Sequence, residues 1–239
     1  GSDYALLRES FIKMRPQALR KRQDTKKIER IMVCFGGSDP KNFTIKALDM
    51  IKESGFSGAI DIVLGFSSNK QAEVENYCKG LANTCSMYTN PNMTDLMLKA
   101  DLAIGASGSG IWERACLGLP SVVMPIADNQ EMIFQALQDA GKIFSLKEYL
   151  NAADKSPFYE IAGNIVDGFG VNRVLMEGLS AGTRSVSLKK VMPEDKDRIF
   201  SWQSLKEVRQ YARHPASPSY QEHTQWFERR LKQVADPYW

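Results

Sequence analysis

The sequence predicts an α/β protein built around a Rossmann-like, mostly parallel sheet. Short apolar runs alternate with helical segments from residue 31 to residue 140. Alternation at this pace indicates right-handed βα units. Runs that are apolar throughout are typical of strands covered on both faces. Ligands of such sheets bind where strands end, so the loops after Phe35, Leu64, Ile104 and Met124 form the candidate site.

The first half of this region is expected to supply two strands and two helices. The strands are expected at 31–35 and 60–65, and the helices at 42–54 and 69–81. The first strand is an apolar run that stops at Gly36 and Gly37. In the helix that follows, Phe43, Ala47 and Leu48 share one face, which predicts burial of that face.

The second half repeats the pattern with shorter elements. Strands are expected at 85–88, 102–105 and 121–125, and helices at 93–99, 109–117 and 129–140, with a further helical segment near 161–179. The strand at 85–88 is weakly apolar, whereas the strand at 102–105 is apolar up to Gly105.

Three parts of the chain differ in charge and pattern. Residues 1–30 form a basic leader, helical or extended and interrupted by Pro16, with nine Lys/Arg against four Asp/Glu. Residues 31–182 form the main domain, with eleven Lys/Arg against seventeen Asp/Glu. Residues 183–239 follow a small polar stretch that predicts a linker. They restart with a strand at 185–191 and helical stretches near 193–202 and 220–234. About 55 residues make a poor independent core, so this tail is expected to open a second, incomplete domain.

Composition excludes several classes of function. Hydrophobic residues make up 43% and charged residues 25%, which is ordinary for a soluble globular protein, and no apolar run could span a bilayer. Four cysteines without CxxC spacing and only two histidines favour a reduced, cytoplasmic protein without a metal site. The acidic main domain lacks the basic patch that nucleic acid requires. The Gly1-Ser2 start resembles a tag-cleavage scar, so the chain is expected to be a piece of a larger protein.

A glycine-rich turn after the strand at 102–105 carries the strongest signal. Ser107, Gly108, Ser109 and Gly110 connect this strand to a helix. Such a turn lets free N–H groups approach an anion closely, with help from the helix dipole. The alternative is an ordinary βα turn capped by serine. It is not the dinucleotide fingerprint, because Glu113 occupies the position of the third glycine.

Glu113 lies about one turn into the same helix. A carboxylate only accepts hydrogen bonds and can therefore hold both hydroxyls of a ribose. The alternative is that Glu113 is simply a favourable acidic residue in a first helical turn.

Two further loops are expected at the same edge of the sheet. Gly36, Gly37 and Ser38 form a second loop rich in N–H groups. Asp128, Asn129 and Gln130 add polar groups after the last strand, or else cap the next helix.

Together these residues resemble the C-terminal half of GT-B-type UDP-sugar enzymes, and in particular the UDP-sugar hydrolases of pseudaminic acid biosynthesis. The resemblance covers residues 3–180 and rests on Gly36-Gly37-Ser38, Asn90-Pro91-Asn92-Met93, Asp101 through Gly110, Glu113, Gly118-Leu119-Pro120, Pro125 and Asp128-Asn129-Gln130. It implies that the chain binds a UDP-sugar as substrate and uses no cofactor or metal. It also implies that the catalytic base lies in an N-terminal half that this chain lacks.

The resemblance assigns a role to each loop. The diphosphate is expected to contact Gly36, Gly37, Ser38, Ser107, Gly108, Ser109 and Gly110. Glu113 holds the ribose, the backbone near Asn90 and Met93 contacts the uracil, and Asp128, Asn129 and Gln130 lie at the sugar.

The tail resembles the opening of a GNAT acetyltransferase. The resemblance rests on residues 186–195, Trp202, residues 207–209 and the segment from Glu222 to Phe227. GNAT enzymes bind the pyrophosphate of acetyl-CoA through a glycine loop, yet no glycine occurs after Val191, so acetyl-CoA is expected only for a complete domain. His223 is expected to be a half-buried helix residue and not a base.

The sequence therefore predicts the UDP-binding half of a UDP-sugar hydrolase in nonulosonic or surface-sugar synthesis, from a bifunctional hydrolase–acetyltransferase. Two alternatives remain open. The chain could be the donor half of a glycosyltransferase, with an acceptor hydroxyl in place of water, or a noncatalytic nucleotide-binding module.

Overall fold

The computed structural model describes residues 2–37, 39, 41–65, 68–180, 191–209 and 216–232, without the side chains of 178–180, 207 and 232. The chain divides into two compact units, residues 1–177 and 178–239. Every element of the candidate site belongs to the first unit.

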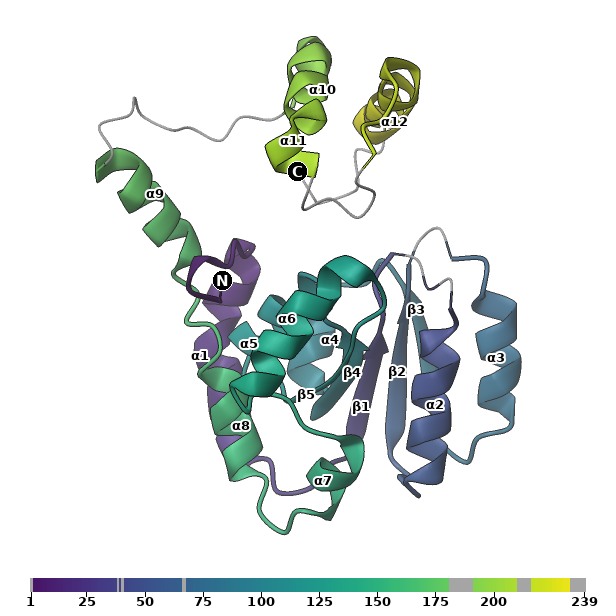
Figure 1. Cartoon of the computed structure of the whole chain (residues 1–239). Helices are drawn as coiled ribbons and strands as arrows, with labels where there is room; N and C mark the ends of the chain where they lie inside the picture. The colour runs from purple at the N-terminus through teal and green to yellow at the C-terminus, as the bar shows by residue number, and fades with distance from the viewer. Residues whose placement is uncertain are drawn as a thin grey trace. The chain divides into compact units, whose positions relative to one another are not determined.

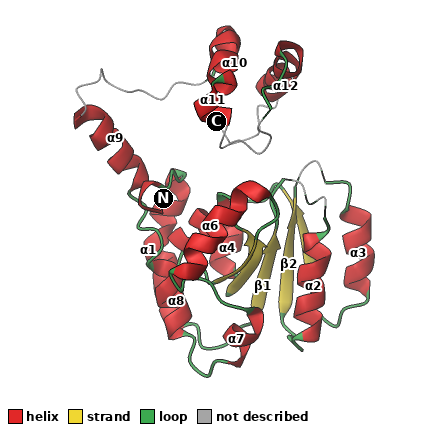
Figure 2. Ribbon diagram, viewed as in Figure 1, coloured by secondary structure: helices red, strands yellow, loops and turns green. Residues whose placement is uncertain are grey.

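The first unit contains a five-stranded parallel sheet in the order β3-β2-β1-β4-β5 (Figures 1 and 2). The strands are β1 (Arg30–Cys34), β2 (Ala59–Leu64), β3 (Cys85–Thr89), β4 (Leu102–Ala106) and β5 (Ser121–Met124). Each begins and ends within a residue or so of its expected position. The predicted α/β fold with a Rossmann-like parallel sheet is confirmed.

Helices cover both faces of this sheet, because residues along each strand alternate between two hydrophobic clusters. In β1, Ile31 and Val33 pack with α2 (Phe43–Glu53), α3 (Gln71–Lys79) and α7 (Leu146–Asn151). Met32 points to the other face and packs with α1 (Glu9–Asp24), α4 (Met93–Lys99) and α5 (Gly110–Cys116). Burial on both faces explains why the central strands read as continuous apolar runs.

Three details differ from the sequence prediction. The expected helix near 161–179 is divided into α8 (Ser156–Gly163) and α9 (Gly170–Ser180), since Gly168 between them has a φ of +92°. Helix α7 was not expected, although Ser145 and Glu148 form a capping box at its start. Helix α6 (Asp128–Asp139) has Ala127 at its N-cap, so Asp128 starts the helix and does not cap it.

Helix α1 runs through Pro16 without a break and docks on the domain through its basic side chains. Arg22 is buried and donates to the carbonyls of Met97 and Ala100 at the end of α4. Arg15 donates to the carbonyls of Cys116 and Gly163, at the ends of α5 and α8. Cations at helix C-termini satisfy carbonyls that lack a partner within the helix. The docking of α1 places the residues before it, including the 3-10 turn η1 (Ser2–Tyr4), beside the domain.

In the second unit, the described residues form η2 (Pro193–Asp195), α10 (Lys196–Ser204), α11 (Lys206–Arg209) and α12 (Tyr220–Lys232). His223 is buried, more deeply than expected, with its ring nitrogens 3.1 Å from Gln203 Oε1 and 2.9 Å from the Lys196 carbonyl oxygen. Residues 185–190 of the expected strand and residues 181–183 of the expected linker lie outside the described residues. None of the described helices is long and apolar enough to span a membrane.

Candidate functional site

The carboxyl ends of β1 and β4 meet at the point where the strand order reverses. The chain continues from β1 to β2 on one side, whereas β4 and β5 lie on the other side (Figure 1). Cys34 at the end of β1 is in register with Gly105 of β4. The loops that follow these strands therefore diverge from one place, which in open α/β sheets is the usual ligand crevice.

The β4–α5 loop presents backbone amides. Ser109 occupies the N-cap position of α5, but its side chain makes no capping hydrogen bond. Within the described part of the chain, the N–H groups of Gly108, Ser109 and Gly110 have no hydrogen-bond acceptor. Ser107 is fully buried, and its hydroxyl donates to the Gln130 carbonyl at 3.3 Å. Of the four predicted residues, three offer free amides, and Ser107 holds the loop in place.

The β1–α2 loop is built differently. Gly36 has a φ of +82°, which favours glycine, and Gly37 is exposed. Asp39 accepts hydrogen bonds from the N–H groups of Phe43 and Thr44, both at 2.7 Å. These bonds satisfy the start of α2, and the backbone of Gly36 and Gly37 is exposed beside it. Ser38 lies outside the described residues.

Gln130 connects the two sides of the site. Its side-chain Oε1 accepts from the N–H of Ile126 at 3.2 Å, and its Nε2 lies 3.3 Å from the position of a Cβ on Gly108. Gln130 is 9% exposed, whereas Asp128 and Asn129 are exposed in the first turn of α6. Gln130 thus braces the glycine loop, and its predicted contact with the sugar stays a prediction.

Glu113 is half-buried in the first turn of α5 and forms an ion pair across the fold. Its Oε1 lies 3.0 Å from Nη2 of Arg8, in the segment before α1. Burial raises the pKa of the Glu113 carboxyl, and the Arg8 guanidinium offsets part of that rise. Spacing in the sequence does not reveal this partner, because the two residues are 105 positions apart.

Asn90 directly follows β3, and Met93 is the first residue of α4. Strand β3 is separated from β1 by β2 in the sheet. Asn90 has a φ of +52° and is exposed, and Asn92 caps α4 by accepting from the N–H of Thr94 at 3.1 Å. Helix α4 contacts both β1 and α1. At its start, the hydroxyl of Thr94 donates to the hydroxyl of Ser10 at 3.3 Å. The start of α4 is therefore close to the start of α1, on the same side of the sheet as Glu113.

Two residues of the site were missed in the sequence. Gly65, at the end of β2, passes so close to Gly37 that a Cβ there would lie 2.0 Å from the Gly37 carbonyl oxygen. Arg114 is 3% exposed and donates to the Ala106 carbonyl at 2.8 Å and to the Ser121 hydroxyl at 3.0 Å. Its Nη1 lies 3.1 Å from the position of a Cβ on Gly105, directly below the glycine loop. Spacing patterns do not reveal either contact.

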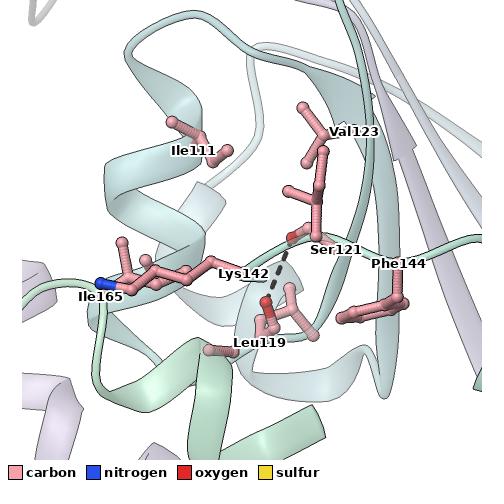
Figure 3. A pocket seen from close by; sticks show the side chains of 10 residues that line it. Ile111, Leu119, Ser121, Val123, Lys142, Phe144 and Ile165 are labelled. Carbon is pink, nitrogen blue, oxygen red and sulfur yellow. Dashed lines mark hydrogen bonds between the residues drawn. The ribbon is translucent and has the colours of Figure 1, made fainter. Parts of the chain in front are cut away.

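A small cavity lies elsewhere, at the start of β5 (Figure 3). It is lined mainly by apolar side chains such as Ile111, Val123 and Phe144, and the Ser121 hydroxyl at its wall donates to the Leu119 carbonyl at 3.1 Å. A volume of about 10 Å³ is close to the least that a single water needs. This cavity is too small for a nucleotide, and none of the predicted site residues lines it.

Parts of the chain are similar to a known protein family and to known proteins. Residues 31–149 match the glycosyltransferase family 28 C-terminal domain. A stretch of 127 residues is 34% identical to an uncharacterised protein, MJ1062, of Methanocaldococcus jannaschii, covering 52% of this chain and 26% of that protein. A stretch of 166 residues is 28% identical to the spore coat polysaccharide biosynthesis protein SpsG of Bacillus subtilis, covering 68% of this chain and 47% of that protein.

Among solved structures, the chain is similar to MurG of Acinetobacter baumannii, with a TM-score of 0.48 and 17% identity. That similarity covers 66% of this chain and 51% of the MurG chain. This chain thus spans about half the length, or less, of the curated relatives that it matches.

Proposed function

We propose that this chain binds the UDP part of a UDP-sugar at the carboxyl ends of β1 and β4, because residues 31–149 match the glycosyltransferase family 28 C-terminal domain. One observation carries the proposal. Free amides of the β4–α5 loop, the exposed glycines after β1 and the Glu113 carboxylate all lie at the switch point of one sheet. Oriented amides suit a diphosphate, and a carboxylate suits a ribose diol.

The buried guanidinium of Arg114 is a further argument for an anion site at the β4–α5 loop. Residues 31–182 are acidic, with eleven Lys/Arg against seventeen Asp/Glu, so the net charge of this domain does not attract a diphosphate. Burial lowers the pKa of Arg114, but an arginine side chain stays positively charged in proteins. The Arg114 guanidinium lies beneath the glycine loop. A fixed positive charge under free amides favours an anion bound above them.

We propose hydrolysis of the UDP-sugar as the reaction of the longer protein. The bond between the anomeric carbon and the phosphate oxygen breaks, and UDP leaves with the bonding electrons. Water attacks the anomeric carbon and gives its proton to a base from a second domain, which completes the cleft. The amides of Gly108, Ser109 and Gly110 stabilise the charge that develops on UDP. The name of the SpsG relative favours a role in surface-polysaccharide synthesis, and four free cysteines favour a cytoplasmic setting.

A second candidate is glycosyl transfer, which the family name favours. An acceptor hydroxyl then replaces water at the anomeric carbon. For the longer protein, turnover in ¹⁸O-labelled water separates the two, since hydrolysis places the label in the free sugar and transfer does not. Binding without turnover in the longer protein would instead indicate a noncatalytic module.

For the tail we propose an acetyltransferase-like domain of the same protein, on the sequence pattern alone. Both ring nitrogens of His223 face polar atoms of α10 and its neighbourhood, so this histidine has a structural role. Because no glycine follows Val191, calorimetric titration of this chain with acetyl-CoA should give no binding.

The test of nucleotide binding compares UDP with 2′,3′-dideoxy-UDP on the wild type and on Glu113→Gln. A charged acceptor is worth about 1.5–3 kcal/mol, so the variant should bind UDP about tenfold or more weakly and lose its preference for the ribose hydroxyls. Glu131→Gln is the matched control, because Glu131 is an exposed acidic residue in the first turn of α6. Equal preference for UDP in all three proteins would exclude Glu113 as the ribose ligand, and no binding of UDP to the wild type would exclude the proposed function.

A further inference from the structure

We propose that Arg8 is a positioning residue that holds the carboxylate of Glu113 charged and correctly oriented for the ribose of a bound nucleotide. This inference rests on the proposed function and adds to it a residue from outside the matched domain, residues 31–149.

The geometry leaves part of the carboxylate available. Arg8 binds Oε1 through a single nitrogen, Nη2, at 3.0 Å. Among the described residues, no hydrogen bond to Oε2 of Glu113 is found. An ionised carboxylate has about four acceptor positions, so one ion pair leaves room for the two hydroxyls of a ribose. Arg8 can therefore fix the carboxylate without replacing the ligand.

Arg8 is itself held in place. Its guanidinium stacks on the ring of Phe11, with its central carbon 4.9 Å from the ring centroid, and Phe11 is fully buried. The Arg8 carbonyl accepts from the N–H of Phe11 at 3.0 Å, which fixes the start of α1. A planar guanidinium stacked on an aromatic ring is pre-organised for a carboxylate in a way that an ammonium is not.

The start of α1 also contacts the loop expected to bind the base. Ser10 pairs with Thr94, which directly follows Met93. The segment from Arg8 to Ser10 therefore touches the elements of both the ribose carboxylate and the base loop. Docking of α1 by Arg15 and Arg22 keeps this segment there.

Electrostatics give the ion pair a measurable consequence. Burial raises the pKa of Glu113, whereas Arg8 and, more weakly, Arg114 lower it. Among the described residues, the thiols of Cys34 on β1 and Cys116 on α5 also interact electrostatically with Glu113, and burial raises the pKa of both thiols. Without Arg8, the Glu113 carboxylate should take up a proton at a higher pH than in the wild type. As the pH falls, the preference for UDP over 2′,3′-dideoxy-UDP should therefore disappear earlier in an Arg8 variant than in the wild type.

The experiment measures the ratio of the dissociation constants of 2′,3′-dideoxy-UDP and UDP between pH 5 and pH 8.5. The ratio cancels titration of the terminal phosphate, which both nucleotides carry. Arg8→Met keeps an aliphatic side chain of similar reach and removes the charge, whereas Arg8→Lys keeps the charge. Lys13→Ala is the matched control, because Lys13 is an exposed cation of α1 that pairs with Glu9. Thermal melting of each variant reports folding independently of binding.

Removal of an opposite charge at this distance should move the midpoint of the ratio upward by about one pH unit or more. Between the two midpoints, Arg8→Met should then show a preference for UDP about tenfold below that of the wild type. Arg8→Lys should restore most of the preference, and Lys13→Ala should match the wild type. An unchanged or increased preference in Arg8→Met, with UDP still bound by the wild type, overturns the role of Arg8 alone. Failure of the wild type to bind UDP overturns the proposed function and this inference together.

Discussion

The end of β2 and the glycine loop after β1 are in such close contact that the Gly37 carbonyl oxygen lies 2.0 Å from where a Cβ on Gly65 would stand. The Gly37 oxygen is a backbone atom, and the position of a Cβ on residue 65 is fixed by the backbone. Neither atom can therefore move away by rotation of a side chain. Gly65 therefore fixes the path of the loop that we expect to meet the diphosphate.

Gly65→Ala should displace the Gly37 loop and lower stability by about 1–3 kcal/mol, a typical cost of overpacking. UDP affinity should fall with it. Urea unfolding and calorimetric titration measure the two effects. Gly80→Ala is the control, since a Cβ there meets only an ordinary contact at 3.5 Å. If Gly65→Ala is as stable as the wild type, the loop of Gly37 can move away from residue 65 at little cost, and the prediction is wrong.

Gly37→Ala should weaken UDP binding without lowering stability. A Cβ on Gly37 meets nothing within 4 Å, so the folded state tolerates it. If the diphosphate approaches the Gly37 backbone closely, the added methyl should weaken UDP binding while melting stays within a degree or two of wild type. Unchanged UDP affinity in this variant would place the diphosphate away from β1.

Arg114→Met should be strongly destabilising because its partners are buried. The Ala106 carbonyl would lose its donor, at a cost of about 1–3 kcal/mol, and so would the hydroxyl of Ser121 in part. UDP affinity should also fall, because a positive charge beneath the glycine loop is removed. Arg20→Met on the exposed side of α1 is the control for charge. Chemical denaturation that shows equal stability for both variants would contradict the assigned contacts.

Arg22→Ala should show that α1 belongs to the same folding unit as the sheet. Arg22 is 1% exposed, and its loss leaves the Met97 carbonyl without its side-chain donor and the Ala100 carbonyl with only the longer bond from Lys21 at 3.4 Å. We expect a loss of about 2–4 kcal/mol, from one unsatisfied carbonyl, one weakened acceptor and a lost buried stem. Amide exchange should then rise in α1 and α4 together. Exchange that rises in α1 alone would show that the leader unfolds separately.

The thiol of Cys78 should be slow to react. Burial and a hydrogen bond with Cys85 raise its pKa to about 12. At pH 8 the thiolate fraction is then about 10⁻⁴, far below that of an ordinary thiol with a pKa of about 8.5. Alkylation by iodoacetamide, followed by peptide mass spectrometry, should rise about tenfold per pH unit through pH 10. Cys85→Ala should speed the reaction, and half-maximal reaction of wild-type Cys78 near pH 8.5 would contradict the prediction.

Local patterns in the sequence were enough to predict the five strands and most of the helices. Short apolar runs bounded by glycine specify buried parallel strands, and helical spacing specifies one buried face, so both signals act over a few residues. The loop from Ser107 to Gly110 could be predicted in the same way, because the conformation of a tight turn depends on the residue types within the turn. Helix α7 could have been found by the same means, from the capping box of Ser145 and Glu148.

Only the tertiary structure decided which of these residues offer free groups. Asp39 and Ser109 both precede helices in glycine-rich loops, yet Asp39 caps α2 and Ser109 leaves α5 uncapped. The amide oxygen of Gln130 accepts from the N–H of Ile126, a contact that the sequence does not reveal. Each difference depends on where a neighbouring backbone passes, which local spacing does not encode.

The sequence by itself therefore determined the parallel α/β sheet, its glycine loops and the identity of Glu113 as a candidate ligand. The tertiary structure alone determined the partners of those residues: Arg8 for Glu113, Gly65 for Gly37, and Arg114 for the loop above it. The physical reason is the range of the interactions. Backbone conformation and burial pattern follow from neighbours in sequence, whereas an ion pair between residues 105 positions apart exists only once α1 has docked against α5.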